Sequence, residues 1–173
     1  MNPPIRSLRI ASLWNGKSIP EAHHIVIEWV QLPQCIELRI DAPYCGSPAA
    51  PEAAPGPTDR LWEHEVVEVF VAGSNDQYTE IELAPSGHHL VLQLAGVRNP
   101  VATKLPLRFD AEVLKDRWRG VARIDIGLLP PTPWRVNATA IYGEGALRTY
   151  LSMTPLAGPE PDFHQPDRFR PLD

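Results

Sequence analysis

The segment DRLWEHEVVEVFV, residues 59–71, combines a run of β-branched valines with carboxylates, a tryptophan and a histidine. The valines and Phe70 favour an extended strand. Glu68 lies in the middle of this apolar run, where burying a carboxylate is costly. Three explanations fit: a zinc site, a ligand-binding face that Glu68 shares with Trp62, or a position of Glu68 on the solvated face of a sheet.

The zinc explanation rests on HEVVE, residues 64–68, which differs by one residue from the HExxH signature. In that signature, two histidines four residues apart on one helix reach the same zinc ion. In a strand, positions i and i+4 lie about 13 Å apart, too far to share an ion. The remaining histidines show no ligand spacing, so we expect no bound zinc.

Catalytic motifs are missing elsewhere in the sequence as well. We find no motif for a serine or cysteine nucleophile, no phosphate-binding glycine loop and no dinucleotide fingerprint. We therefore predict no catalytic residues and a protein that is not an enzyme, with a metal-dependent hydrolase as the weakest of three function hypotheses.

Strand patterns follow one another along the chain, about every 8 to 15 residues, which is typical of a sandwich or barrel. Twenty prolines argue for short elements joined by loops, and the Pro-, Ala- and Gly-rich residues 42–59 predict one long loop. With neither a repeat nor a linker, we predict a single antiparallel β-sandwich domain over residues 1–173. The nine strands are expected at 23–30, 35–43, 65–72, 77–83, 88–94, 107–115, 119–126, 134–143 and 146–153.

Alternation within two of these strands separates an apolar face from a polar one. The polar faces carry Tyr78, Glu80 and Glu82 in one strand, and Arg135, Asn137 and Thr139 in the other. We expect Glu68 and Glu80 to point into a shared polar depression, together with Asn137 or Arg135. The alternative is that these faces meet solvent, as half-buried antiparallel sheets do.

Composition limits the partners and the compartment. The net charge is −5 and the sequence holds no basic run, which argues against nucleic acid and anionic membranes as partners. Neither a signal peptide nor an apolar stretch of about 20 residues is visible, so we expect a cytoplasmic protein. Cys35 and Cys45 lack CxxC spacing, and we expect them to be free and buried, although their pairing stays open.

Three stretches together resemble the family 9 carbohydrate-binding modules and, more closely, the DOMON-like bacterial proteins related to them. The first is LWEHEVVEVFVA (61–72), with the Trp-Glu-x-x-x-Val-Glu-hydrophobic-Phe pattern. The second is YTEIELAPSG (78–87), a tyrosine-led strand that ends in a proline-glycine turn, and the third is PDFHQPDRFRPL (161–172). The resemblance implies a jelly-roll-like β-sandwich.

The resemblance also implies a sugar site. In the sugar-binding members two aromatic side chains sandwich a terminal sugar ring, and these positions fall on Trp62 and Phe163. The glutamate that bonds ring hydroxyls falls on Glu68. Along a straight strand Trp62 and Glu68 would lie about 20 Å apart, so the chain around Trp62 must curl back.

The chain departs from the sugar-binding members at three positions. Phe163 stands where they have tryptophan, Glu82 where they have arginine, and Ala84 where they have asparagine. We expect the ligand-binding set to be Trp62, Glu68, Glu80, Glu82, Asn137 and Phe163.

The first function hypothesis is a non-catalytic module that binds a small carbohydrate or a sugar terminus. The second is a stand-alone cytoplasmic β-sandwich that binds a non-sugar ligand or a partner protein. No cofactor is expected. The structural calcium that the family resemblance implies is not assigned to any residue, and the oligomeric state is left open.

Overall fold

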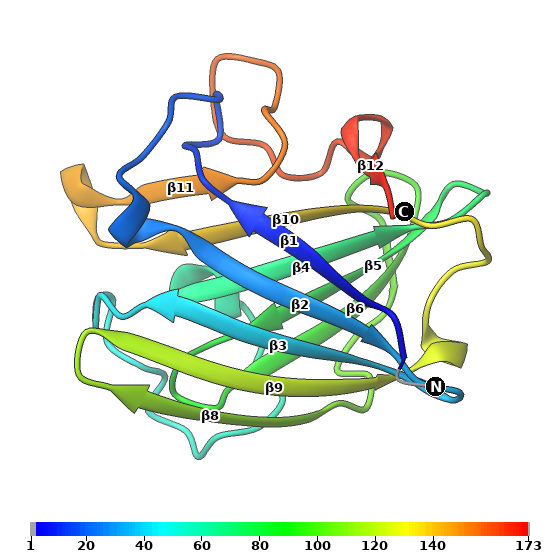
Figure 1. Cartoon of the computed structure of the whole chain (residues 1–173), viewed down its shortest axis with the longest axis horizontal. Coiled ribbons are helices and arrows are strands. Elements are labelled where there is room, and N and C mark those ends of the chain that lie inside the picture. Colours follow the sequence, from blue (N-terminus) through cyan, green and yellow to red (C-terminus); the bar gives the residue numbers. More distant parts are fainter. Residues whose placement is uncertain (1–2, 173) are drawn as a thin grey trace.

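The computed structural model describes residues 3–172, which form two packed antiparallel sheets (Figure 1). These residues contain five single-turn 3-10 helices and no α-helix, and none of the helices could span a membrane. The first sheet has the order β1-β2-β3-β9-β8 and consists of β1 (Ile5–Ile10), β2 (Ile25–Gln31), β3 (Cys35–Pro43), β9 (Arg117–Asp125) and β8 (Arg108–Leu114). The second sheet has the order β11-β10-β4-β5-β6-β7, and β12 pairs with β10 as a seventh strand. Its strands are β11 (Thr149–Ser152), β10 (Arg135–Tyr142), β4 (Val66–Ala72), β5 (Gln77–Leu83), β6 (His89–Ala95), β7 (Pro100–Ala102) and β12 (Arg170–Pro171). The predicted antiparallel β-sandwich is confirmed.

The main core lies between the two sheets. Successive side chains of a strand point to opposite faces, so Val67, Val69 and Val71 of β4 face the first sheet, where Trp29 and Trp118 are also fully buried. Burying each such side chain stabilises the fold by about 1.5–3 kcal/mol relative to leaving it exposed.

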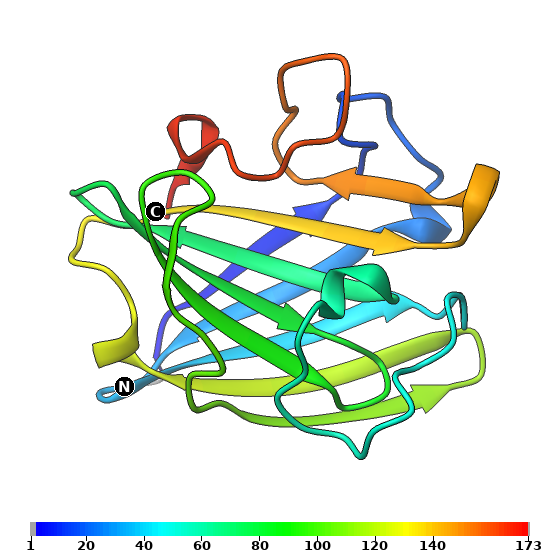
Figure 2. The same ribbon diagram turned by 180° about the vertical axis from the view of Figure 1, so that it is seen from behind.

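A second apolar cluster covers the opposite face of the seven-stranded sheet, which faces the viewer in Figure 2. Phe70 and Tyr78 point outward from the sheet, and Phe163 and Phe169 of the C-terminal segment pack in the same cluster. β4 is therefore buried along its whole length on both faces. An antiparallel sheet commonly has one face exposed to water, whereas here side chains of the C-terminal segment pack on that face.

The strand boundaries differ from the prediction at several places. The strands at 35–43 and 77–83 have the predicted bounds, whereas the strand predicted at 146–153 is reduced to β11 because the 3-10 helix η4 (Gly145–Leu147) precedes it. The turn into η4 is tight: Gly143 has φ +79°, and a Cβ there would lie 2.3 Å from the Leu147 carbonyl oxygen. β1, β7 and β12 were not predicted.

The two cysteines are far apart. Cys35 begins β3 and Cys45 lies two residues after its last residue, Pro43, and a nine-residue strand is about 30 Å long. A disulfide needs Cα atoms within about 7 Å, so both thiols are free. The expectation that they are buried is wrong for Cys45, which is exposed, and only in part right for Cys35.

Candidate functional site

A cavity of about 380 Å³ opens on the outer face of the seven-stranded sheet. Its floor carries Glu68 and Phe70 from β4 and Glu80 from β5. Segments that are distant in sequence supply its walls, namely the 3-10 helix η2 (Leu61–Glu63), β11 and the C-terminal segment after it. The cavity combines an acidic floor with largely apolar walls.

Of the six residues expected from the sequence to bind a ligand, four line this cavity: Trp62, Glu68, Glu80 and Phe163. Glu82 is fully buried beside them but does not line the cavity. Asn137 lies elsewhere and has a structural role, because its amide donates to Ser152 Oγ at 3.1 Å and accepts from the Thr154 N–H at 3.1 Å.

The expected polar depression therefore forms in part. Glu68 and Glu80 share it, but the expectation that Asn137 or Arg135 joins them is wrong. Arg135 donates to the Pro166 carbonyl at 2.8 Å, which fastens the C-terminal segment to β10. β10 contributes Thr139 in their place, because Thr139 is the residue of β10 that pairs with Glu68 of β4.

Two aromatic walls come from outside the sheet. Trp62 lies in η2, directly before β4, and its side chain is 41% exposed. The turn that begins at Arg60, with φ 57°, brings the chain back over the sheet. Phe163 is buried and packs edge-on against Tyr150, with ring centroids 6.1 Å apart.

Arg148 holds the Trp62 wall in place. Its guanidinium donates to the Trp62 carbonyl at 2.6 Å and to the carbonyls of Glu63 and Gly143 at 3.3 Å each. It also donates to the Tyr150 hydroxyl at 3.1 Å. One side chain thus ties η2 to the β10–β11 connection.

The three glutamates meet because of strand register. Glu68 pairs directly with Glu82 across β4 and β5, and Glu80 lies two residues before Glu82 on the same face. One carboxylate oxygen from each lies within 4.8 Å of the other two. Thr139 Oγ1 donates to Glu68 Oε2 at 2.5 Å.

Burial raises the pKa of all three carboxyls. The pKa of Glu68 rises to about 7, with the Thr139 hydrogen bond and the charge of Arg148 opposing the rise. Burial, and then the charge of Glu68, raise the pKa of Glu80 well above its usual range. Burial and the charges of both neighbours do the same for the pKa of Glu82. The cluster therefore retains protons at neutral pH when nothing else neutralises it.

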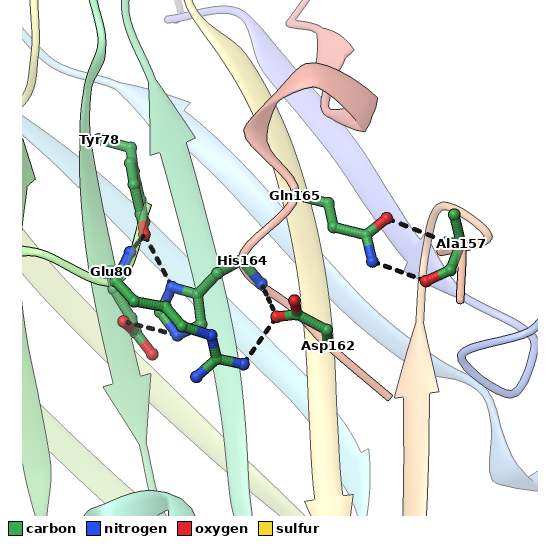
Figure 3. A network of polar contacts seen from close by, with 7 residues as sticks. Tyr78, Glu80, Ala157, Asp162, His164 and Gln165 are labelled. Atoms are coloured by element: carbon green, nitrogen blue, oxygen red, sulfur yellow. Dashed lines mark hydrogen bonds and ion pairs between the residues drawn. The ribbon is translucent and has the colours of Figure 1, made fainter. Parts of the chain in front are cut away.

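His164 lies beside the floor without adding charge (Figure 3). The Tyr78 hydroxyl accepts from the Arg98 N–H at 3.0 Å and lies 2.8 Å from His164 Nδ1. Burial, and then the charge of Arg98, lower the pKa of His164 to about 4. The imidazole is therefore neutral at pH 7, and its Nε2 lies 4.0 Å from Glu80 Oε2.

HEVVE is divided between two elements. His64 ends η2, and its Nδ1 lies 2.7 Å from the Ala49 carbonyl oxygen, while Glu68 lies in β4. His64 does not belong to the glutamate group. The absence of tightly bound zinc stays a prediction.

Sequence reasoning missed several residues of the cavity. Tyr150, Arg98 and His164 line it, and Thr139 orients Glu68. Tyr150 and His164 were within reach, because Tyr150 lies in the predicted strand 146–153 and His164 in the stretch 161–172 that resembles the family 9 modules. Arg98 lies in a turn between β6 and β7, and no periodic pattern marks its contribution.

Solved structures with similar folds include carbohydrate-binding proteins. A proposed carbohydrate-binding protein from Bacteroides uniformis has a TM-score of 0.74 at 16% identity, over 96% of this chain and 84% of that one. A family 9 carbohydrate-binding module from Caldicellulosiruptor kristjanssonii in complex with cellotriose has a TM-score of 0.53 at 11% identity, over 84% and 72%. A module of the same family and organism in complex with glucose has a TM-score of 0.51 at 13% identity, over 75% and 66%. The fold is therefore like that of family 9 modules, while the resemblance to DOMON-like proteins is not supported.

Proteins of similar sequence come from vertebrates, so the bacterial setting implied by the resemblance is too narrow. No protein-family model matches the chain. The UPF0462 protein C4orf33 homolog of Mus musculus is 37% identical over 175 residues, which cover 95% of this chain and 89% of the relative. UPF0462 protein C4orf33 of Homo sapiens is 34% identical over 171 residues, which cover 94% and 85%. The chain belongs to the UPF0462 family.

Proposed function

We propose that this protein is a non-catalytic carbohydrate-binding module that holds a small sugar or a sugar terminus in the cavity on the outer sheet face. The observation that carries the proposal is that Trp62, Phe163 and Glu68 line one cavity, although Trp62 and Phe163 are far apart in the sequence. Trp62 and Phe163 are the two positions that the family resemblance assigns to the aromatic walls.

The chemistry of the cavity suits a pyranose. The apolar C–H faces of a sugar ring pack on aromatic side chains, and the walls include Trp62, Tyr150 and Phe163. Glu68 and Glu80 supply hydrogen bonds from the floor, and hydrogen bonds to a charged group contribute roughly 1.5–3 kcal/mol each. A protonated carboxyl can both donate to and accept from hydroxyl groups.

Size and fold support the same proposal. Small-molecule sites are commonly about 300–1,000 Å³, and the cavity is at the lower end with about 380 Å³. Glu82 stands where the sugar-binding members have arginine, but this difference is less unfavourable for sugar binding than the sequence alone implied. The Glu82 side chain lies beside the floor and does not line the cavity. Sugar complexes are known for the family 9 modules of similar fold.

The first prediction is weak binding of glucose, cellobiose or xylobiose that depends on Trp62. A site that buries one or two rings should have a dissociation constant of about 10 μM to 1 mM. Trp62→Ala should weaken the binding free energy by on the order of 2 kcal/mol, as the loss of a central aromatic does, and move the affinity out of the measurable range. Titration calorimetry and tryptophan fluorescence measure both.

Tyr44→Ala is the matched control, since Tyr44 is 39% exposed and lies outside the cavity; this variant should bind like the wild type. Phe163→Trp provides a larger ring and should tighten binding if the ring packs on the sugar. If neither wild type nor Phe163→Trp binds any of the three sugars, the carbohydrate proposal is rejected for them and a non-sugar ligand becomes the better hypothesis.

A further inference from the structure

We propose that Glu68, Glu80 and Glu82 form a binding site for one hard divalent cation of the size of Ca²⁺, at the floor of the cavity. This site goes beyond the proposed sugar binding and does not depend on it. It is built on the sheet itself, by residues that neighbouring strands place side by side.

The geometry of the cluster matches one ion. A carboxylate oxygen from each glutamate lies within 4.8 Å of the other two. Calcium takes oxygen ligands at about 2.3–2.6 Å, so two ligands on opposite sides of one ion lie up to about 5 Å apart. The donor set contains only carboxylates, which favour calcium, magnesium or manganese over zinc or copper.

Glu82 is an independent sign that something is missing from the cluster. Its side chain is 0% exposed, and neither carboxylate oxygen has a hydrogen-bond partner of good geometry, with only the backbone of Trp62 close enough to oppose the rise in its pKa. Buried polar groups in folded proteins are almost always hydrogen-bonded, and an isolated buried carboxylate is among the most costly groups to leave unpaired. A cation bound among the three glutamates would satisfy these oxygens.

The positive side chains around the cluster are engaged elsewhere. Arg148 donates to backbone carbonyls and to Tyr150, and Arg98 pairs with Asp162 at 2.7 Å. His164 Nε2 lies 4.0 Å from Glu80 Oε2, beyond hydrogen-bonding distance. The two arginines act on the glutamates only through their charge at longer range, so within residues 3–172 no basic side chain takes the position of the ion.

The cluster is accessible and one of its members is already oriented. Glu68 and Glu80 line the cavity, so an ion can enter from that side, and water or sugar hydroxyls can complete its coordination. Thr139 fixes the Glu68 carboxylate from the side of β10, as hydrogen-bonding partners behind metal ligands commonly do.

The test is calcium binding to the whole protein in the absence of any sugar. After treatment with a chelator and its removal, Ca²⁺ should bind with one-to-one stoichiometry in calorimetry and raise the melting temperature. Binding must displace protons from the carboxyls, so affinity should rise with pH, and titrations in two buffers of different ionisation enthalpy should show proton release. Mn²⁺ provides a second readout, because its free-ion electron paramagnetic resonance signal should fall on binding and recover when Ca²⁺ is added.

Two variants make the result specific. Glu82→Gln keeps the shape of the buried side chain and should weaken Ca²⁺ binding at least tenfold, while its melting temperature in chelator stays at or above that of the wild type because folding no longer has to protonate this side chain. Glu112→Gln, on the exposed surface of β8, should bind like the wild type.

Two outcomes would overturn the proposal. One is no response of the wild type to Ca²⁺ or Mn²⁺ at about 10 mM, above the roughly 1 mM constant of the weakest calcium sites. The other is equal affinity of wild type and Glu82→Gln, which means adventitious binding to the acidic surface. Repeating the sugar titrations with chelator and with Ca²⁺ separates the two proposals, since metal binding is measured without sugar and survives a failure of sugar binding.

Discussion

Glu68 shows how much of this site is decided by single side chains. Its neighbours in sequence are valines that fill the main core, while Glu68 itself points to the opposite face and is only 2% exposed. The explanation that it lies in solvent is therefore wrong. Burial raises the pKa of Glu68 to about 7, against the hydrogen bond from the Thr139 hydroxyl and the charge of Arg148, so the carboxyl favours its protonated form more than an exposed glutamate does.

This electrostatic state predicts that stability falls as pH rises in the presence of a chelator. The folded-state pKa of Glu68 is about 7, above its ordinary value of 4.5, so the native protein binds more protons than the unfolded chain between these values. Its stabilising contribution is complete below about pH 4.5 and is lost as pH rises through about 7. Urea unfolding at several pH values measures the slope.

Glu68→Gln should remove part of that slope, because an amide does not titrate, whereas Glu112→Gln should keep all of it. A slope in Glu68→Gln as steep as in the wild type would show that Glu68 is already ionised in the native protein.

At the scale of elements, the cavity depends on how η2 is held above the sheet. This 3-10 helix has a single turn and no side-chain cap, and a turn of that length has little stability of its own. Arg148 supplies the missing contacts through its bonds to the carbonyls of Trp62 and Glu63. The aromatic wall is thus positioned by a residue 86 positions away in the sequence.

We predict that Arg148→Met loosens this wall. Loss of several hydrogen bonds to a charged donor should lower the free energy of unfolding by on the order of 1 kcal/mol and should increase amide exchange across residues 60–64. Any sugar affinity should fall with it, because Trp62 is then less ordered before binding.

Arg60→Met is the control for that variant. Arg60 is exposed and forms a surface ion pair with Glu63, and such pairs contribute little. Unchanged exchange in Arg148→Met would mean that η2 holds its position without the guanidinium.

At the scale of the whole molecule, the C-terminal segment turns a two-layer sandwich into a fold with a covered outer face. Phe169 packs on Phe70 and Tyr78, with ring centroids 5.7 and 6.4 Å apart. The same segment carries Phe163 and His164 into the cavity wall. The same segment therefore both closes the second cluster and supplies part of the cavity wall.

Phe169→Ala should accordingly affect both stability and binding. Truncating a buried phenylalanine costs about 3–5 kcal/mol, a large share of the 5–15 kcal/mol that typically separates folded from unfolded domains. Denaturant unfolding measures the loss, and sugar titration below the unfolding transition should show weaker binding. Leu147→Ala, at an 80% exposed position, should change neither, and a similarly small effect of Phe169→Ala would mean that the segment is not tightly packed on the sheet.

Local patterns were sufficient for the fold class and for most strands. Alternation assigned Glu80 and Glu82 to one face of β5 and Thr79 and Ile81 to the other, because side-chain direction in a strand depends only on the residue's position along it. The strand β1 was not predicted because Arg6, Ser7 and Arg9 interrupt its apolar residues. Such an edge strand is formed by pairing with β2 and not by its own pattern.

The sequence by itself determined which side chains face the same way within each strand, and its resemblance to family 9 modules pointed to Trp62, Glu68 and Phe163. Only the tertiary structure decided what lies over that face. Strand register placed Glu82 beside Glu68, Trp62 and the C-terminal segment supplied walls of the cavity that Glu68 lines, and Asn137 was taken up by bonds to Ser152 and Thr154. These contacts join residues far apart in the chain, and a local period carries no information about which distant segment will exclude water from a given face.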